Sequence, residues 1–220
     1  VLAPHCTGTS GSHNDTGALS NVDYAHVAML TGQSLLCAEA LNCAAPDTGN
    51  MEVLARFGSS EQREHWLRPL LDGRAKSCFA MTENQVSSSD PTQLQATATK
   101  SRDGTWTLAG HKWWTTGATH PDCDLCIFVA CTGEDSLGCG GSSREASRRA
   151  AIQSESKSFK RKSTPRYDQH SLFVLSIHNP GVQVVRPLSV FGYDDAPSGH
   201  AEVKFDDVCV EPGALLGRVG

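Results

Sequence analysis

The sequence predicts an α+β protein in which N-terminal helices precede an antiparallel β-barrel or sandwich. Apolar residues recur at helical spacing from Asn21 to about residue 76, and at Ser77 the pattern changes to the alternation of strands. Many short apolar runs then follow, separated by Gly, Pro and Asp turns. Helices first and strands afterwards are typical of α+β proteins. We therefore expect a flexible lead-in over 1–20, a partial helical domain over 21–76 and a β-domain over 77–220.

The helical part is expected to contain three helices. The first has Asn21 as a plausible N-cap, because apolar residues follow it at three-and-four spacing. A second is expected over 51–57, before Gly58. Ser59 followed three residues later by Gln62 is a capping box, so it predicts the start of the third helix. Three short helices offer only a small core, so we expect them to pack on the barrel and not to fold alone.

The β-part contains one strong hairpin signal and several further strands. The alternating runs 95–100 and 105–109 flank an Arg-Asp-Gly turn, which predicts an antiparallel hairpin. The other expected strands are short, apolar and bounded by turn residues: 125–130, 171–177, 182–186, 202–205 and 208–210.

The stretch 133–166 differs from its surroundings. It is rich in Gly, Ser, Arg and Lys, and 144–166 holds eight basic residues against two acidic ones. Such a segment buries too little apolar surface to offset its ordering entropy, so we expect a disordered insertion. A basic docking arm for an acidic partner is the alternative.

Composition excludes several classes of protein. A net charge of −5 argues against nucleic acid as the partner, and no apolar run is long enough for a membrane span. The chain begins at Val1 without a signal-peptide pattern, so we expect a fragment or a processed protein.

The nine cysteines do not suggest a disulfide framework. Their number is odd and most lie in apolar segments, which favours buried free thiols and a reducing compartment. The thiols concerned are Cys37, Cys43, Cys78, Cys126 and Cys209. The pair Cys123 and Cys126 has the spacing of a zinc knuckle, but on a strand positions i and i+3 face opposite sides, so no metal site is expected.

Two hydroxyl-rich turns are the candidate functional segments. The first, 79–90, is an apolar strand that ends in Thr82, Ser88, Ser89 and other polar residues, and such a loop can hold a phosphate or a polar ring edge. It lacks the Gly-Lys-Ser/Thr ending of a phosphate-binding P-loop. The second, 110–118, carries two adjacent tryptophans. Adjacent side chains on a strand face opposite ways, so one ring can pack inward while the other lines a pocket. The alternatives are an ordinary loop for the first segment and two core tryptophans for the second.

The two segments together resemble the flavin-binding middle domain of the acyl-CoA dehydrogenases. The family's "TE…SD" segment is similar to Thr82-Glu83 through Ser89-Asp90, and its "W-(I/T)-T" segment is similar to Trp114-Thr115-Thr116. The "FAMTE", "KWWT" and "FGYDDAP" sequences are similar to the subgroup of family members 10 and 11. The chain departs from the pattern at Asn84, where the family usually has Pro, and in having Ser where many members have Gly.

The resemblance implies FAD as the cofactor and a set of residues that contact it. These residues are Phe79, Met81, Thr82, Ser88, Ser89, Trp114, Thr115 and Thr116, with Ser89 also near the acyl-CoA substrate. The first three would lie against the flavin ring, with Thr82 reaching its N5 edge. The carboxylates Glu39, Glu83, Asp194 and Asp195 show no paired catalytic geometry, and Glu83 is interpreted as support for the loop.

The implied activity is α,β-dehydrogenation of an acyl-CoA thioester by a flavoprotein oxidoreductase of fatty-acid β-oxidation type. In the family the catalytic base comes from a C-terminal helical domain, so no catalytic residue is expected in this chain. The resemblance also implies an electron-transfer flavoprotein or oxygen as electron acceptor, a homo-oligomer in the full-length protein, and a mitochondrial or peroxisomal location. The alternatives are an inactive truncated or mis-spliced barrel, and an interaction module that uses the basic insertion.

Overall fold

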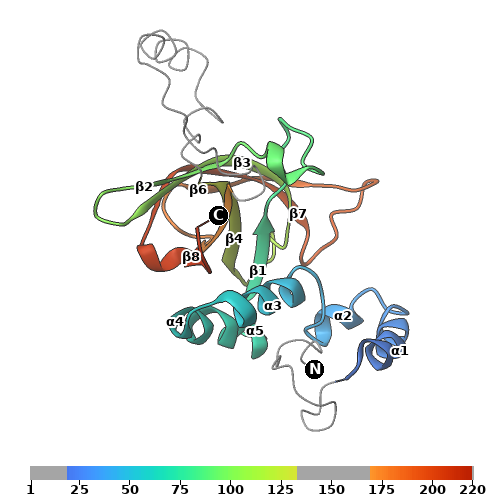
Figure 1. Cartoon of the computed structure of the whole chain (residues 1–220). Coiled ribbons are helices and arrows are strands. Elements are labelled where there is room, and N and C mark those ends of the chain that lie inside the picture. The colour runs from blue at the N-terminus through green and yellow to red at the C-terminus, as the bar shows by residue number, and fades with distance from the viewer. Residues whose placement is uncertain (1–18, 133–168, 220) are drawn as a thin grey trace.

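The strand-like half of the sequence forms a strongly curved sheet of eight strands (Figure 1). The computed structural model describes residues 19–132 and 169–219. Neighbouring strands follow the order β6-β7-β3-β2-β4-β5-β8, and β1 pairs with β4. The strands are β1 (Lys76–Ala80), β2 (Thr97–Lys100), β3 (Trp106–Thr116), β4 (Cys123–Cys131), β5 (His170–Ser176), β6 (Val182–Leu188), β7 (His200–Val210) and β8 (Leu215–Leu216).

The α+β class and the predicted hairpin are confirmed. Strands β2 and β3 pair antiparallel with Lys100 opposite Trp106. The two runs 202–205 and 208–210 belong to the single strand β7. Two pairings depart from the antiparallel expectation. Strand β1 runs parallel to β4 along its whole length, and β2 pairs parallel with β4 where Thr97 lies opposite Cys131.

The helical part consists of short elements, drawn in blue and cyan below the sheet in Figure 1. They are α1 (Asn21–Thr31), α2 (Cys37–Ala40), α3 (Asp47–Phe57), α4 (Ser60–Gln62), η1 (Arg63–Leu67) and α5 (Arg68–Leu71). The capping box at Ser59 is confirmed, with Gln62 N–H on the serine hydroxyl and the Gln62 side chain on the Ser59 N–H. The N-cap of α1 is Ser20 and not Asn21, because the Ser20 hydroxyl accepts from Asp23 N–H.

The helix expected over 51–57 is α3, and it starts at Asp47, four residues earlier than expected. Tertiary contacts explain the difference, since Asp47 and Asn50 are buried against the start of β1. The Asp47 carboxylate accepts from Ser77 N–H at 2.8 Å and from Ser77 Oγ at 2.6 Å, and Asn50 Nδ2 donates to the same hydroxyl at 2.8 Å. This first turn is therefore stabilised by the barrel and not by local apolar spacing.

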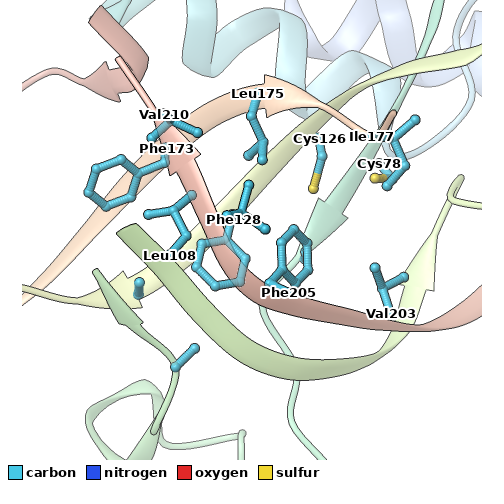
Figure 2. Close-up of a cluster of buried hydrophobic side chains, with 14 of the residues drawn as sticks. Cys78, Leu108, Cys126, Phe128, Phe173, Leu175, Ile177, Val203, Phe205 and Val210 are labelled. Atoms are coloured by element: carbon cyan, nitrogen blue, oxygen red, sulfur yellow. The ribbon is translucent and has the colours of Figure 1, made fainter. Parts of the chain in front are cut away.

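Two hydrophobic clusters hold these parts together. The first fills the interior of the curved sheet, where Phe128 lies against Phe205 with ring centroids 4.3 Å apart (Figure 2). The second lies between the helices and the outer face of β4, β5 and β8, and it contains Met51, Leu54, Leu67, Leu70, Leu125, Ile127, Val174 and Leu216. The helices therefore share a core with the barrel.

The expected thiol burial is only partly correct. Cys78 and Cys126 are buried, Cys37 and Cys43 are half-buried, and Cys209 is exposed. Cys209 was expected inside because its neighbours are apolar, but on β7 both Val208 and Val210 point inward, so the residue between them faces solvent. Among the described residues no group of His, Cys, Asp or Glu could hold a metal ion.

The structure does not describe two of the segments singled out in the sequence. The lead-in, apart from residues 19 and 20, and the insertion 133–166 lie outside the described residues. On either side of the insertion, Thr132 N–H donates to Gln169 C=O at 2.8 Å. In residues 19–132 and 169–219 no helix is long and apolar enough to cross a membrane.

Candidate functional site

The two hydroxyl-rich segments lie side by side in the structure. Strand β1 ends at Ala80 and leads directly into the first segment, while the second segment forms the end of β3. The Trp113 N–H donates to the Thr82 carbonyl at 2.9 Å, which joins the two backbones. The sequence predicted each segment separately, and the structure brings them together.

A buried ion pair fixes the base of the first loop. Glu83 and Lys112 are 3% and 0% exposed, and Lys112 Nζ lies 2.8 Å from Glu83 Oε1. The same ammonium donates to the Met81 carbonyl at 2.9 Å. The carboxylate also accepts from Gln95 N–H at 2.8 Å and from Ala96 N–H at 2.9 Å, so it closes the loop at both ends. Burial lowers the pKa of Lys112, and the charge of Glu83 acts against that shift.

Ser88 braces the same loop from within. Its hydroxyl accepts from Glu83 N–H at 2.8 Å and donates to Glu83 C=O at 3.1 Å. The Ser88 side chain is therefore turned toward the base of the loop, while Ser89 is exposed. The phosphate contact expected of the two serines stays a prediction, with Ser89 the freer of the pair.

Both tryptophans of the second segment lie outside the barrel. Trp114 has φ of 51°, and the register of β3 against β7 shifts between Lys112 and Thr115. Because of this bulge Lys112 and Thr115 point inward, while Trp114 is exposed and the half-buried Trp113 belongs to neither hydrophobic cluster. The alternative of two core tryptophans is wrong, and so is the expectation that one ring packs inward.

The Trp114 ring forms one wall of a surface that also carries hydroxyl groups. The ring is 38% exposed and meets His200 edge-on, with centroids 5.9 Å apart. Thr116 Oγ1 lies 3.0 Å from His200 Nδ1, and Asp195 Oδ2 lies 3.2 Å from His200 Nε2. The sequence did not single out His200, because its role depends on the pairing of β3 with β7.

Two of the predicted site residues direct their side chains elsewhere. Phe79 packs against the cluster shared with the helices. The Thr115 hydroxyl is buried and makes no hydrogen bond to any residue in the described part of the chain. A ligand on the outer surface could meet these two residues only through their backbone. The structure therefore leaves Trp114 as the exposed element of the site, with Met81, Thr82 and Thr116 half-buried beside it.

Backbone geometry requires glycine next to this surface. Gly117 has φ of 87°, and a Cβ there would overlap the Ser77 carbonyl. Its N–H donates to Gly199 C=O at 3.0 Å, which anchors the loop that carries Asp195. The second segment is thus fixed on one side by β1 and on the other by the start of β7.

A cavity of about 760 Å³ lies farther along β3, and residues of β6, β7 and the 83–96 stretch also line it. At its wall Gln85 Nε2 is 3.2 Å from His111 Nδ1, and His111 Nε2 is 2.6 Å from Glu202 Oε1. Arg186 Nε donates to the other carboxylate oxygen at 2.7 Å, and this hydrogen bond lowers the pKa of Glu202. Sequence reasoning missed this row, since its members are neighbours only across strands.

Comparison with known proteins gives consistent similarities. Residues 78–144 match the family model described as "Acyl-CoA dehydrogenase, middle domain". Mouse acyl-CoA dehydrogenase family member 10 is 44% identical over 200 residues, which are 90% of this chain and 16% of that protein. A putative acyl-CoA dehydrogenase from Mycobacterium abscessus is 39% identical with a TM-score of 0.76, covering 91% of this chain and 42% of that one.

A more distant structure shares the fold. The glutaryl-CoA dehydrogenase from Mycobacterium smegmatis in complex with FADH2 has a TM-score of 0.54 at 22% identity, covering 78% of this chain and 34% of that one. The chain thus spans less than half the length of each of these relatives.

Proposed function

The chain belongs to the acyl-CoA dehydrogenase family, and from that premise we propose that it forms the FAD-binding surface of an oxidoreductase acting on acyl-CoA thioesters. The proposed surface consists of Met81, Thr82, Trp114 and Thr116, with Ser89 directed toward the phosphates of FAD and CoA. The observation that carries the proposal is the junction of the two segments through the Trp113–Thr82 hydrogen bond.

The residues of this surface suit a planar, polar ring system. An exposed indole offers an aromatic face, and such faces stack on other aromatic systems. Thr82 is half-buried at the junction of the two segments, and we assign its hydroxyl to the ring edge of the ligand. Bound FAD would supply the acceptor for the hydride that leaves the β-carbon of the thioester. The chain's residues would hold the ring in place and exclude water from one side of it.

We do not assign the α-proton to Glu83, although this carboxylate belongs to the site's first loop. It already accepts hydrogen bonds from Lys112 and from two backbone N–H groups, and its side chain is buried. Its role in the proposal is to hold the loop. On the family resemblance we propose an electron-transfer flavoprotein or oxygen as the electron acceptor, and a homo-oligomer as the intact protein.

FAD titration of the purified chain tests the proposal. We expect saturable binding with a perturbed flavin spectrum, weakened by Trp114→Ala by about 0.5–1.5 kcal/mol beyond the loss of buried area. Thr82→Val should lose about 1 kcal/mol through one hydrogen bond, a roughly fivefold rise in Kd. Trp66→Ala, which removes an indole from the helical part, is the matched control and should leave Kd unchanged. Equal losses in all three variants, or no binding by the unmodified chain, would contradict the proposal.

A further inference from the structure

Three side chains form a hydrogen-bonded row at the edge of the proposed flavin surface. Thr116 is the last residue of β3, and it pairs with His200, the first residue of β7. His200 Nδ1 lies 3.0 Å from Thr116 Oγ1, and His200 Nε2 lies 3.2 Å from Asp195 Oδ2. The His200 ring also meets the Trp114 ring at an interplanar angle of 68°. The row therefore contacts the exposed Trp114 ring through His200.

The chemistry of the row fixes the direction of each hydrogen bond. An ionised carboxylate can only accept, so Asp195 selects the tautomer in which His200 Nε2 carries the hydrogen. In neutral imidazole the other nitrogen is then an acceptor, so His200 Nδ1 must accept from the Thr116 hydroxyl. A hydroxyl has one hydrogen and two lone pairs. Thr116 thus directs its hydrogen toward His200 and leaves only acceptor lone pairs for a ligand.

We propose, building on the proposed function, that Asp195 and His200 are positioning residues that make Thr116 a hydrogen-bond acceptor toward the flavin. Two-electron reduction adds two electrons and a proton to a ring nitrogen that is only an acceptor in oxidised flavin. An acceptor hydroxyl therefore favours the reduced form, which offers the additional N–H, over the oxidised form. The row would raise the midpoint potential of bound FAD and strengthen the binding of reduced relative to oxidised cofactor.

The test is the ratio of the Kd values for oxidised and reduced FAD, measured together with the midpoint potential by dye equilibration. His200→Phe keeps a ring against Trp114 but removes both nitrogens, so the Thr116 hydroxyl can rotate and donate. We expect the ratio to fall about tenfold, which corresponds to about 30 mV for two electrons. Thr116→Val removes the acceptor and should give a similar fall. The double variant should add nothing, because the two residues act through one hydrogen bond.

Asp195→Ala and Asp194→Ala form a matched pair on the neighbouring loop. Asp195 contacts His200, while the Asp194 carboxylate accepts from Ala196 N–H. Only Asp195→Ala should lower the ratio, and its side chain is 55% exposed, so this variant decides the question if His200→Phe does not fold. Equal shifts in both would mean a general effect of charge and would overturn the inference.

The remaining outcomes are also decisive. If the unmodified chain binds no FAD, the proposed function fails. If it binds FAD and His200→Phe leaves the ratio and the potential unchanged while Thr116→Val lowers them, the proposed function stands and the positioning role of His200 is refuted.

Discussion

Replacing Lys112 by Met should destabilise the protein strongly, because it leaves a buried carboxylate without its counter-charge. Lys112 is 0% exposed, and its ammonium donates to both Glu83 and the Met81 carbonyl. Methionine has a similar shape and no charge. Removing one partner of a buried ion pair typically costs about 3–5 kcal/mol, since the remaining charge stays desolvated. We expect a loss of that size in the free energy of unfolding.

A double-mutant cycle measures the interaction between Lys112 and Glu83 separately from the contribution of each residue alone. Glu83→Gln in the Lys112→Met background removes the unpaired charge, so we expect the double variant to be more stable than Lys112→Met alone. The Gln side chain keeps one oxygen for the two backbone N–H groups of Gln95 and Ala96. It therefore cannot satisfy both as the carboxylate does, and recovery should be incomplete.

Urea denaturation followed by far-UV circular dichroism and by tryptophan fluorescence provides the measurement. Arg186→Met is the matched control, because Arg186 also pairs with a glutamate but its side chain is 60% exposed. Exposed pairs contribute at most about 1 kcal/mol. The reasoning would be refuted if Lys112→Met and Arg186→Met cost the same, or if adding Glu83→Gln lowered stability further.

Three other predictions concern the remaining parts of the molecule. Leu54→Ala, at a fully buried position shared by helices and barrel, should cost about 2–5 kcal/mol, with far-UV circular dichroism and barrel fluorescence changing at the same denaturant concentration. Separate transitions would show that the helices fold alone. Burial alone would raise the pKa of Glu39, but the Lys76 ammonium outweighs it and the pKa is lowered. This carboxylate therefore stabilises the fold above its unfolded pKa of about 4.3, and the contribution is lost as pH falls through its folded pKa. Thermal melts against pH should show that Glu39→Gln flattens this loss of Tm at acid pH. Replacing 133–166 with a short turn should shift Tm by less than about 5 °C, and a larger drop would assign the insertion a stabilising role.

The sequence determined the elements whose signals are local. The capping box at Ser59 and the β2–β3 hairpin need only residues within a few positions of each other, and both are present. The resemblance carried by the two hydroxyl-rich segments likewise depends on contiguous residues. Even the interpretation of Glu83 as loop support agrees with the structure, in which its carboxylate closes both ends of the loop.

Tertiary structure decided what depends on partners far along the chain. A lysine on a strand is ordinarily exposed, and only the meeting of β3 with the end of β1 gives Lys112 the carboxylate and the carbonyl that make its burial tolerable. The bulge before Thr115 places both tryptophans outside the barrel, and a register shift of this kind arises from the pairing with β7. His200 acquires its partners in the same way. Periodicity reports which residues can share a face, but the contacts across strands depend on register, and register is fixed by the whole sheet.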